Sequence, residues 1–166
     1  MEFLIFSDSH GNTEPMRRVL SQHPTASHVL FCGDGFRDFE TLSAEFPKKI
    51  FVAVKGNCDL FVFDENAPVE RTFELFGLRI LLLHGHTVGV KGGYGVAASH
   101  AYDVGADIVL FGHTHIPFEG KLQVREKTVE LFNPGSIGQR SYCGTFSYGV
   151  LTVGDNGYLF SHGTCK

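Results

Sequence analysis

Residues 2–12 read EFLIFSDSHGN, and this stretch sets the pattern for much of the chain. Its apolar, β-prone first half favours a buried strand, which Asp8-Ser9-His10 ends with an acid and a histidine. A helix is expected next, because Thr13-Glu14-Pro15 places proline in a first helical turn. The opening therefore predicts a strand, a polar loop and a helix.

The same kind of unit follows directly. Residues 29–32 predict a short buried strand ended by Gly33-Asp34-Gly35, and the apolar spacing over 36–46 predicts a helix. Residues 50–54 predict a third strand, which ends at Gly56-Asn57-Cys58-Asp59. The order β-α-β-α-β implies parallel strands joined by right-handed crossovers.

The middle of the chain no longer follows the alternation of strand and helix. Residues 71–75 and 78–83 predict a hairpin, whose second strand ends at His84-Gly85-His86. After a glycine-rich loop and a helix near 96–104, a buried strand at 107–111 is expected. That strand ends at Gly112-His113-Thr114-His115.

The last third is expected to be all β. Turn signals at Glu126-Lys127 and Gly154-Asp155-Asn156-Gly157 separate apolar runs of strand length. We expect this β-rich tail to form a second sheet that packs on the first within one domain. The predicted strands are 122–124, 129–132, 147–153 and 158–161.

The composition favours a single globular domain over residues 1–166. The net charge is −4 and no run is rich in lysine or arginine, so non-specific nucleic-acid binding is not expected. No apolar run approaches the roughly 20 residues of a membrane span, and no signal peptide is expected. None of the four cysteines forms a C-x-x-C pair. We therefore expect a cytoplasmic protein with reduced thiols. The sequence leaves the oligomeric state open, and a homo-oligomer is one option.

Side chains that can bind metals follow five of the predicted strands. These strands end before Asp8, Gly33, Gly56, His84 and Gly112. Each motif alone is weak evidence, because Gly-Asp and Gly-Asn are common in turns and a histidine can be a hydrogen-bonded core residue. Strand ends of an open α/β sheet share one rim, however, so the five loops are expected to meet there. The candidate donors are Asp8, His10, Asp34, Asn57, His84, His113 and His115.

Seven donors are too many for one tetrahedral ion. They suit two ions about 3.5–4 Å apart with one bridging carboxylate. The mixture of carboxylate, imidazole and amide is typical of sites for Mn²⁺, Fe, Zn²⁺ or Ni²⁺. Two divalent cations outweigh the charges of Asp8 and Asp34, and the surplus favours an anionic substrate such as a small phosphate ester.

The chain resembles the calcineurin-like metallophosphoesterase superfamily in the order of its motifs, which read Asp8-x-His10, Gly33-Asp34, Gly56-Asn57-x-Asp59, His84-x-His86 and Gly112-His113-x-His115. The small size and Asn133-Pro134-Gly135-Ser136 resemble its compact YfcE-type phosphodiesterase branch. The resemblance covers about residues 3–137 and implies an α/β fold, an αββα sandwich of two mixed β-sheets flanked by helices.

The resemblance also implies roles for the candidate ligands. It assigns the first metal to Asp8, His10 and His115. It assigns the second to Asn57, His84 and His113, with Asp34 as the bridge. The implied cofactors are two divalent ions, Mn²⁺ first and Ni²⁺, Fe²⁺, Zn²⁺ or Co²⁺ as alternatives. The implied reaction is hydrolysis of a phosphodiester more than a phosphomonoester, by attack of a metal-bridging hydroxide.

Cys58 stands where many superfamily members carry a histidine that protonates the leaving group. A thiol with a pKa of about 8.5 is protonated at neutral pH and can donate, but beside two cations it can also ionise, and it can be a mere spacer. His86 is the alternative donor, and Asp59 is expected to order the loop. The candidate catalytic residues are Asn57, Cys58, Asp59 and His86. The alternative function is a non-catalytic scaffold that binds proteins, resembles the retromer subunit Vps29 and keeps a relic metal site.

Overall fold

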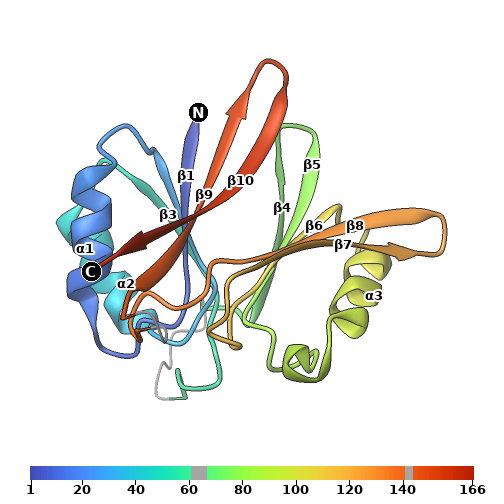
Figure 1. Ribbon diagram of the computed structural model, residues 1–166, viewed down its shortest axis with the longest axis horizontal. Coiled ribbons are helices and arrows are strands. Elements are labelled where there is room, and N and C mark those ends of the chain that lie inside the picture. The colour runs from blue at the N-terminus through green and yellow to red at the C-terminus, as the bar shows by residue number, and fades with distance from the viewer. Residues whose placement is uncertain (61–66, 141–143) are drawn as a thin grey trace.

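The computed structural model describes residues 1–60, 67–140 and 144–166. The elements in these three segments alternate between strand and helix at first and become mostly strands later (Figure 1). In chain order they are β1 (Glu2–Phe6), α1 (Thr13–Gln22), β2 (His28–Phe31), α2 (Phe36–Glu45), β3 (Ile50–Ala53), β4 (Glu70–Leu75), β5 (Leu78–Leu83), η1 (Val90–Gly92), α3 (Gly95–Asp103), β6 (Ile108–Leu110), β7 (Phe118–Val124), β8 (Lys127–Asn133), β9 (Phe146–Gly154) and β10 (Gly157–Cys165).

The strands form two mixed sheets of five, in the orders β10-β9-β1-β2-β3 and β4-β5-β6-β8-β7. In the first sheet β1, β2 and β3 are parallel, as the β-α-β-α-β order predicts. In the second sheet β5, β6 and β8 are parallel, and β4 pairs with β5 in the predicted hairpin. The expected architecture of two mixed sheets flanked by helices is therefore confirmed.

One expectation about the tail is wrong. Only β7 and β8 join the second sheet, whereas β9 returns to the first sheet and pairs antiparallel with β1. Glu2 lies opposite Thr152 in that pairing, and β10 covers β9 at the sheet edge. Alternating side chains identify a strand but carry no information about its partner, so the sequence pattern did not separate the two hairpins.

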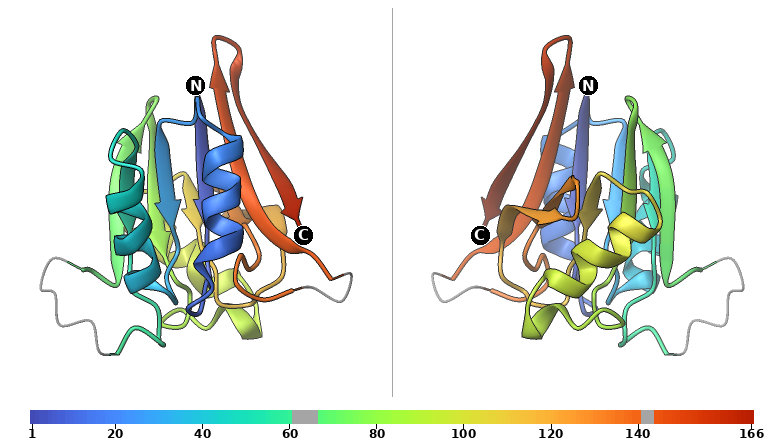
Figure 2. Two further views of the ribbon diagram at one scale, coloured as in Figure 1. Left: turned by 90° about the vertical axis from the view of Figure 1, so that its left-hand side faces the viewer. Right: turned by 90° about the vertical axis from the view of Figure 1, so that its right-hand side faces the viewer.

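Side chains on alternate sides of the strands build three apolar layers. On β1, Phe3 and Ile5 face the second sheet, while Leu4 and Phe6 face the layer that α1 and α2 cover. The third layer lies between the second sheet and α3, where the buried alanines of α3 allow close packing. Figure 2 shows α1 and α2 over one outer face of the sandwich and α3 over the other.

The loops that follow β1, β2, β3, β5 and β6 gather at one edge of the sandwich, the lower edge in Figure 1. The amide of Asp8 donates to the Gly33 carbonyl at 2.9 Å, and the amide of Gly112 donates to the His84 carbonyl at 3.0 Å. The loop after β8 joins them, because the Gly138 amide donates to the Asp8 carbonyl at 3.1 Å. Backbone hydrogen bonds therefore fix the predicted ligand loops relative to one another.

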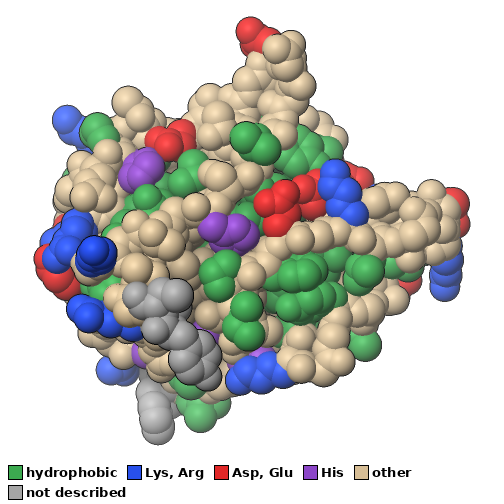
Figure 3. All heavy atoms as spheres, in the orientation of Figure 1, with side chains coloured by type: hydrophobic (Ala, Val, Ile, Leu, Met, Phe, Trp, Pro, Cys, Tyr) green, Lys and Arg blue, Asp and Glu red, His purple; other side chains and the backbone are tan. Residues whose placement is uncertain are grey.

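The surface adds three observations. Within residues 1–60, 67–140 and 144–166, the helices lack the length and apolar character that crossing a membrane requires. On the face drawn in Figure 3, lysine and arginine side chains lie among acidic and apolar ones. The described cysteines, Cys32, Cys58 and Cys165, are free thiols, and Cys143 lies outside the described residues.

Candidate metal centre

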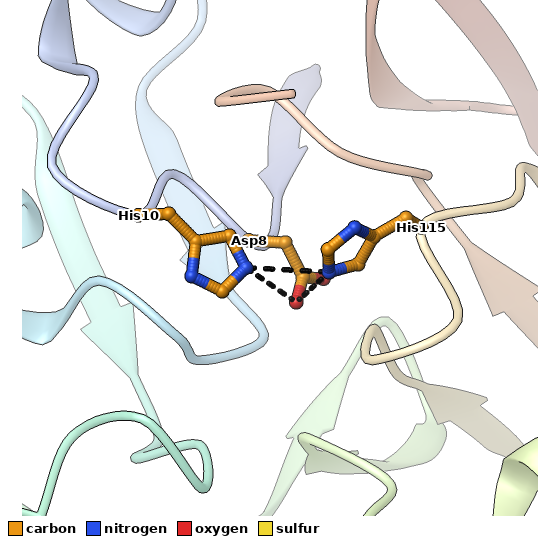
Figure 4. A group of neighbouring side chains, drawn as sticks. All are labelled: Asp8, His10 and His115. Carbon is orange, nitrogen blue, oxygen red and sulfur yellow. Dashed lines mark hydrogen bonds and ion pairs between the residues drawn. The ribbon is translucent and has the colours of Figure 1, made fainter. Parts of the chain in front are cut away.

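Asp8, His10 and His115 form the first group of candidate ligands (Figure 4). His10 Nε2 lies 3.2 Å from His115 Nε2 and 3.7 Å from Asp8 Oδ1. His115 Nε2 lies 3.1 Å from the same Asp8 oxygen. The two rings and the carboxylate point toward one another from two different loops, as ligands of a single cation do.

Asp34, His84 and His113 form the second group. His84 Nε2 lies 3.1 Å from His113 Nδ1 and 3.3 Å from Asp34 Oδ2. His84 and Asp34 are buried, whereas His113 is partly exposed at the edge of the group. The six residues come from four loops, so the fold brings together six of the seven predicted donors.

Asp34 lies between the two groups. Its Oδ2 is 3.3 Å from His84 Nε2 in the second group and 4.0 Å from His10 Nε2 in the first. Its Oδ1 accepts the backbone amide of Cys58 at 2.7 Å. A carboxylate placed in this way can face two cations, which is the geometry of a bridging ligand.

The hydrogen bonding of the Asp8 carboxylate indicates whether a cation fits the first group. Its Oδ2 accepts the Ser7 hydroxyl at 2.5 Å and the His113 amide at 3.0 Å. Its Oδ1 is buried, and among the described residues no donor reaches it in hydrogen-bond geometry. A buried carboxylate oxygen without a hydrogen bond is costly, and a bound cation would satisfy it.

The orientation of the histidine rings also supports a cation site. His84 Nδ1 lies 2.8 Å from the Cys32 carbonyl, and His115 Nδ1 lies 2.9 Å from Gln139 Oε1. Since carbonyl oxygens only accept, both Nδ1 atoms carry the proton, and in the neutral rings both Nε2 atoms keep their lone pairs. Those lone pairs point into the two groups, which is the usual arrangement of metal-binding histidines.

Gln139 was not predicted from the sequence, and its contact with His115 gives a testable consequence. Gln139→Ala is expected to weaken metal binding about 10- to 100-fold, because the ring loses the acceptor that orients it. Competition with a chromophoric chelator measures the affinity, and Gln123→Ala on β7 is the matched control. Equal affinity in wild type and Gln139→Ala would show that this glutamine does not orient the ring.

Burial and mutual charge shift the pKa values of the second group. Burial works against ionisation of Asp34, but the contacts with His84 and the Cys58 amide outweigh it and hold its pKa well below the usual range. Burial likewise opposes charge on His84, yet the contact with Asp34 and the charge of Asp8 raise its pKa. Both shifts favour an ionised Asp34 beside a protonated His84, and a cation binding between them would displace that proton.

The outer histidines are shifted in opposite directions. Burial and the charges of His84 and Lys91 lower the pKa of His113 to about 4. The close contact with Asp8 raises the pKa of His115. His113 is therefore neutral at physiological pH and has a lone pair available for a cation.

The backbone at the site is strained in a way that the sequence does not reveal. Five candidate ligands have left-handed backbone conformations, with φ between 46° and 67°. This region is uncommon for residues other than glycine and tends to persist where function requires it. The five residues are Asp8, His10, Asp34, His113 and His115.

Two glycines allow the loops to approach one another. A Cβ atom at Gly56 would lie 2.1 Å from Asp34 Oδ1, and one at Gly112 would lie 1.8 Å from Ser7 Oγ. Both distances are far below van der Waals contact. Glycine at these positions therefore leaves the room that the Asp34 and Asp8 carboxylates occupy.

Three more of the predicted site residues, Asn57, Cys58 and Asp59, lie on the loop after β3. Asn57 is exposed, and its side-chain nitrogen donates to Cys58 Sγ at 3.4 Å, so its hydrogen bond runs to the thiol rather than to the second group. The Asp59 carboxylate accepts four backbone amides, those of Asp34, Gly35, Phe36 and Gly56, at 2.8–3.0 Å. Asp59 therefore ties this loop to the start of α2.

The two candidate proton donors differ in their surroundings. Cys58 is exposed, and its Sγ lies in a group with His10 and Asp34 in which the ligand atoms are within 4.8 Å of one another. Burial and the neighbouring Asp34 raise the pKa of Cys58 to about 11. His86 is partly buried, its Nδ1 has no partner among the described residues, and burial lowers its pKa.

A cavity of about 380 Å³ opens beside the two groups. Its wall combines candidate ligands with the loop after β3 and the first turn of α2. The lining residues are His10, Gly11, Asp34, Gly35, Arg37, Asp38, Cys58 and Asp59.

Comparison with known proteins agrees with this geometry. Residues 1–156 match the family model described as the calcineurin-like phosphoesterase superfamily domain. The chain is 34% identical over 154 residues to the probable metallophosphoesterase YsnB of Bacillus subtilis, covering 92% of this chain and 85% of that protein.

Two solved structures share the fold at lower identity. YfcE, a phosphoesterase from E. coli, superposes with a TM-score of 0.66 at 23% identity, covering 92% of this chain and 88% of YfcE. Wild-type Vps29 of Entamoeba histolytica in complex with Zn²⁺ superposes with a TM-score of 0.66 at 21% identity, covering 99% of each chain.

Proposed function

The chain belongs to the calcineurin-like phosphoesterase superfamily, and from this premise we propose that it is a two-metal phosphodiesterase acting on a small phosphate ester. The observation that carries the proposal is the pair of ligand groups joined by Asp34. Divalent ions held there, Mn²⁺ first, would lower the pKa of a water molecule and neutralise oxygen charge in the transition state.

Each candidate ligand would have a role set by its position in the two groups. Asp8, His10 and His115 would hold one ion, His84 and His113 the other, and Asp34 would bridge them. Asn57 would complete the second set after its side chain turns from Cys58. The hydrogen bonds from Ser7 and from the His113 amide fix Asp8, and those to Gln139 and the Cys32 carbonyl fix two rings, so that little reorganisation accompanies the reaction.

The shape of the site supports Cys58 as the group that protonates the leaving group. Cys58 lines the cavity beside the ligands, whereas His86 does not. In the metal-free site the raised pKa keeps the thiol of Cys58 protonated at neutral pH. We therefore place the leaving group in this cavity, within reach of Cys58, and leave His86 without a role in proton transfer.

The second candidate function is a scaffold that binds other proteins. The likeness to Vps29 shows that the two chains share a fold. The complete pair of ligand groups favours the enzyme, because a site that no longer works is free to lose ligands.

Activity after reconstitution tests the proposed function. Metal-free protein prepared with a chelator should hydrolyse bis-p-nitrophenyl phosphate when Mn²⁺ or Ni²⁺ is added, and should prefer it to p-nitrophenyl phosphate. The chelator should abolish the activity again. Protein that takes up less than one ion per chain and cleaves neither ester with any added divalent ion would overturn the proposal, and a stoichiometric protein partner would then favour the scaffold.

A further inference from the structure

The loop that follows β1 holds His10, a candidate ligand of the first group, in a conformation that needs support. His10 has a left-handed backbone, with a φ of 46°. Such a conformation is uncommon for residues other than glycine and persists where the surrounding structure fixes it. The position of the His10 ring, whose Nε2 lies 3.2 Å from His115 Nε2, therefore depends on the contacts that hold this loop.

Asp38, in the first turn of α2, supplies two of these contacts. Its Oδ2 accepts the Ser9 hydroxyl at 2.6 Å and the Gly11 amide at 2.8 Å. The two donors belong to the residues directly before and directly after His10. Hydrogen bonds to a charged carboxylate are roughly twice as strong as those between neutral groups. One oxygen atom of Asp38 thus holds the loop on both sides of the ligand.

Gly35 leaves the space for this contact. A Cβ atom at Gly35 would lie 1.8 Å from Ser9 Oγ and 3.0 Å from Asp38 Oδ2, so a larger residue would displace the Ser9 hydroxyl. Gly35 directly follows Asp34, whose carbonyl accepts the His10 amide at 3.2 Å. The loops that carry His10 and Asp34 are therefore tied to one another by Asp38 as well as by the backbone.

Asp38 itself is not among the candidate ligands. It is absent from the three groups of metal-ligating side chains that lie within the described part of the chain. Its Oδ2 is already occupied by the two donors from the loop after β1. Its contacts therefore connect it to a bound ion through His10, and not by coordination.

We propose that Asp38 is a positioning residue, which holds His10 in the conformation that binds metal and so sets the affinity of the first group for its ion. The inference rests on the proposed function, because it assigns a role at the same metal centre. Asp38 would make no contact with the substrate, and it would affect activity only through the ion that His10 helps to bind.

Metal affinity tests this role without catalysis. Calorimetric titration of metal-free protein with Mn²⁺ gives the affinity for each ion, and electron paramagnetic resonance distinguishes a single bound Mn²⁺ from a pair. Asp38→Ala should weaken the binding of one ion about 10- to 100-fold, the effect of losing a residue that orients a ligand, and leave the other ion close to its wild-type affinity. Ser9→Ala removes one of the two hydrogen bonds and should weaken the same ion by a smaller factor, which keeps the test available if Asp38→Ala does not fold.

Two further variants separate positioning from charge. Both hydrogen bonds reach one oxygen atom, so the side-chain carbonyl of the Asp38→Asn variant can keep them, and this variant should retain most of the wild-type affinity. An Asp38→Asn protein that loses as much affinity as Asp38→Ala would show that the charge acts directly on the ion, and the positioning role would be refuted. Glu40→Ala removes an exposed acid from the same helix and should bind both ions as wild type does.

A double variant shows whether Asp38 acts through His10. His10→Ala should weaken the same ion, and adding Asp38→Ala to it should cause no further loss, because the ring that Asp38 positions is already gone. A further loss as large as that of Asp38→Ala alone, or wild-type affinity in Asp38→Ala, would refute the positioning role and leave the phosphoesterase proposal intact. If wild-type protein binds no ion and cleaves no ester, the proposed function itself has failed.

Discussion

Asp34→Asn is expected to lower kcat/KM by on the order of 10³-fold and to leave no more than one ion bound per chain. Asp34 Oδ2 is the atom that faces both ligand groups, at 3.3 Å from His84 Nε2 and 4.0 Å from His10 Nε2. An amide is a weaker, uncharged ligand and cannot bridge two cations as a carboxylate does. Loss of the proposed bridge would remove both the spacing of the ions and one negative charge that would hold them.

The substitution is conservative for the fold. Asparagine keeps an oxygen at the place where Asp34 Oδ1 accepts the Cys58 amide, so the loop after β3 retains its hydrogen bond. Metal-free Asp34→Asn should therefore show the circular dichroism spectrum of metal-free wild type. Asp155→Asn in the turn between β9 and β10 is the matched control and should keep full activity.

Metal content and activity must be measured on the same samples. Emission spectroscopy of dialysed protein gives the number of ions, and steady-state hydrolysis of bis-p-nitrophenyl phosphate gives kcat/KM. An Asp34→Asn protein that binds two ions and keeps wild-type kcat/KM would remove the bridging role and with it the central step of the proposed mechanism.

The fold could be predicted from the sequence where short-range patterns decide it. The strand after Met1 and the helices at 13–22 and 36–45 follow from apolar spacing and turn residues, and the parallel order of β1–β3 follows from the crossovers. The pairing of β9 with β1 could not be predicted in this way. It joins the two ends of the chain, and its register depends on the packing of the finished sheet.

The candidate site shows the same difference between features that short-range sequence patterns predict and features that depend on the finished fold. The candidate ligands could be predicted because each lies in a loop directly after an apolar run, and strand ends share a rim. The roles of Ser7, Ser136 and Gln139 could not be predicted, because they depend on contacts that form only when the chain folds. Ser136 Oγ, for example, donates to the Asp8 carbonyl at 2.9 Å and accepts the Gln139 amide at 2.9 Å. The left-handed backbone of the ligands is likewise invisible in the sequence.

Metal loading is expected to raise the midpoint of thermal unfolding by about 10–20 °C. At a concentration of one hundred times Kd, each occupied site contributes about 2.7 kcal/mol, and each kcal/mol raises Tm by about 2–4 °C in a chain of this size. The structure gives the reason for so strong a coupling. Without a cation, the buried Asp8 Oδ1 lacks a hydrogen bond, and nitrogens of paired histidines meet at 3.1–3.2 Å.

Scanning calorimetry with and without Mn²⁺ measures this shift independently of catalysis. Asp34→Asn should show about half of the wild-type shift or less, because at most one ion remains, whereas Asp155→Asn should show all of it. A wild-type Tm that is the same in chelator and in saturating Mn²⁺, Ni²⁺ or Zn²⁺ would mean that the two groups hold no ion. A full shift without hydrolysis would instead describe a metal-bound scaffold, so this measurement and the activity assay together separate the two functions.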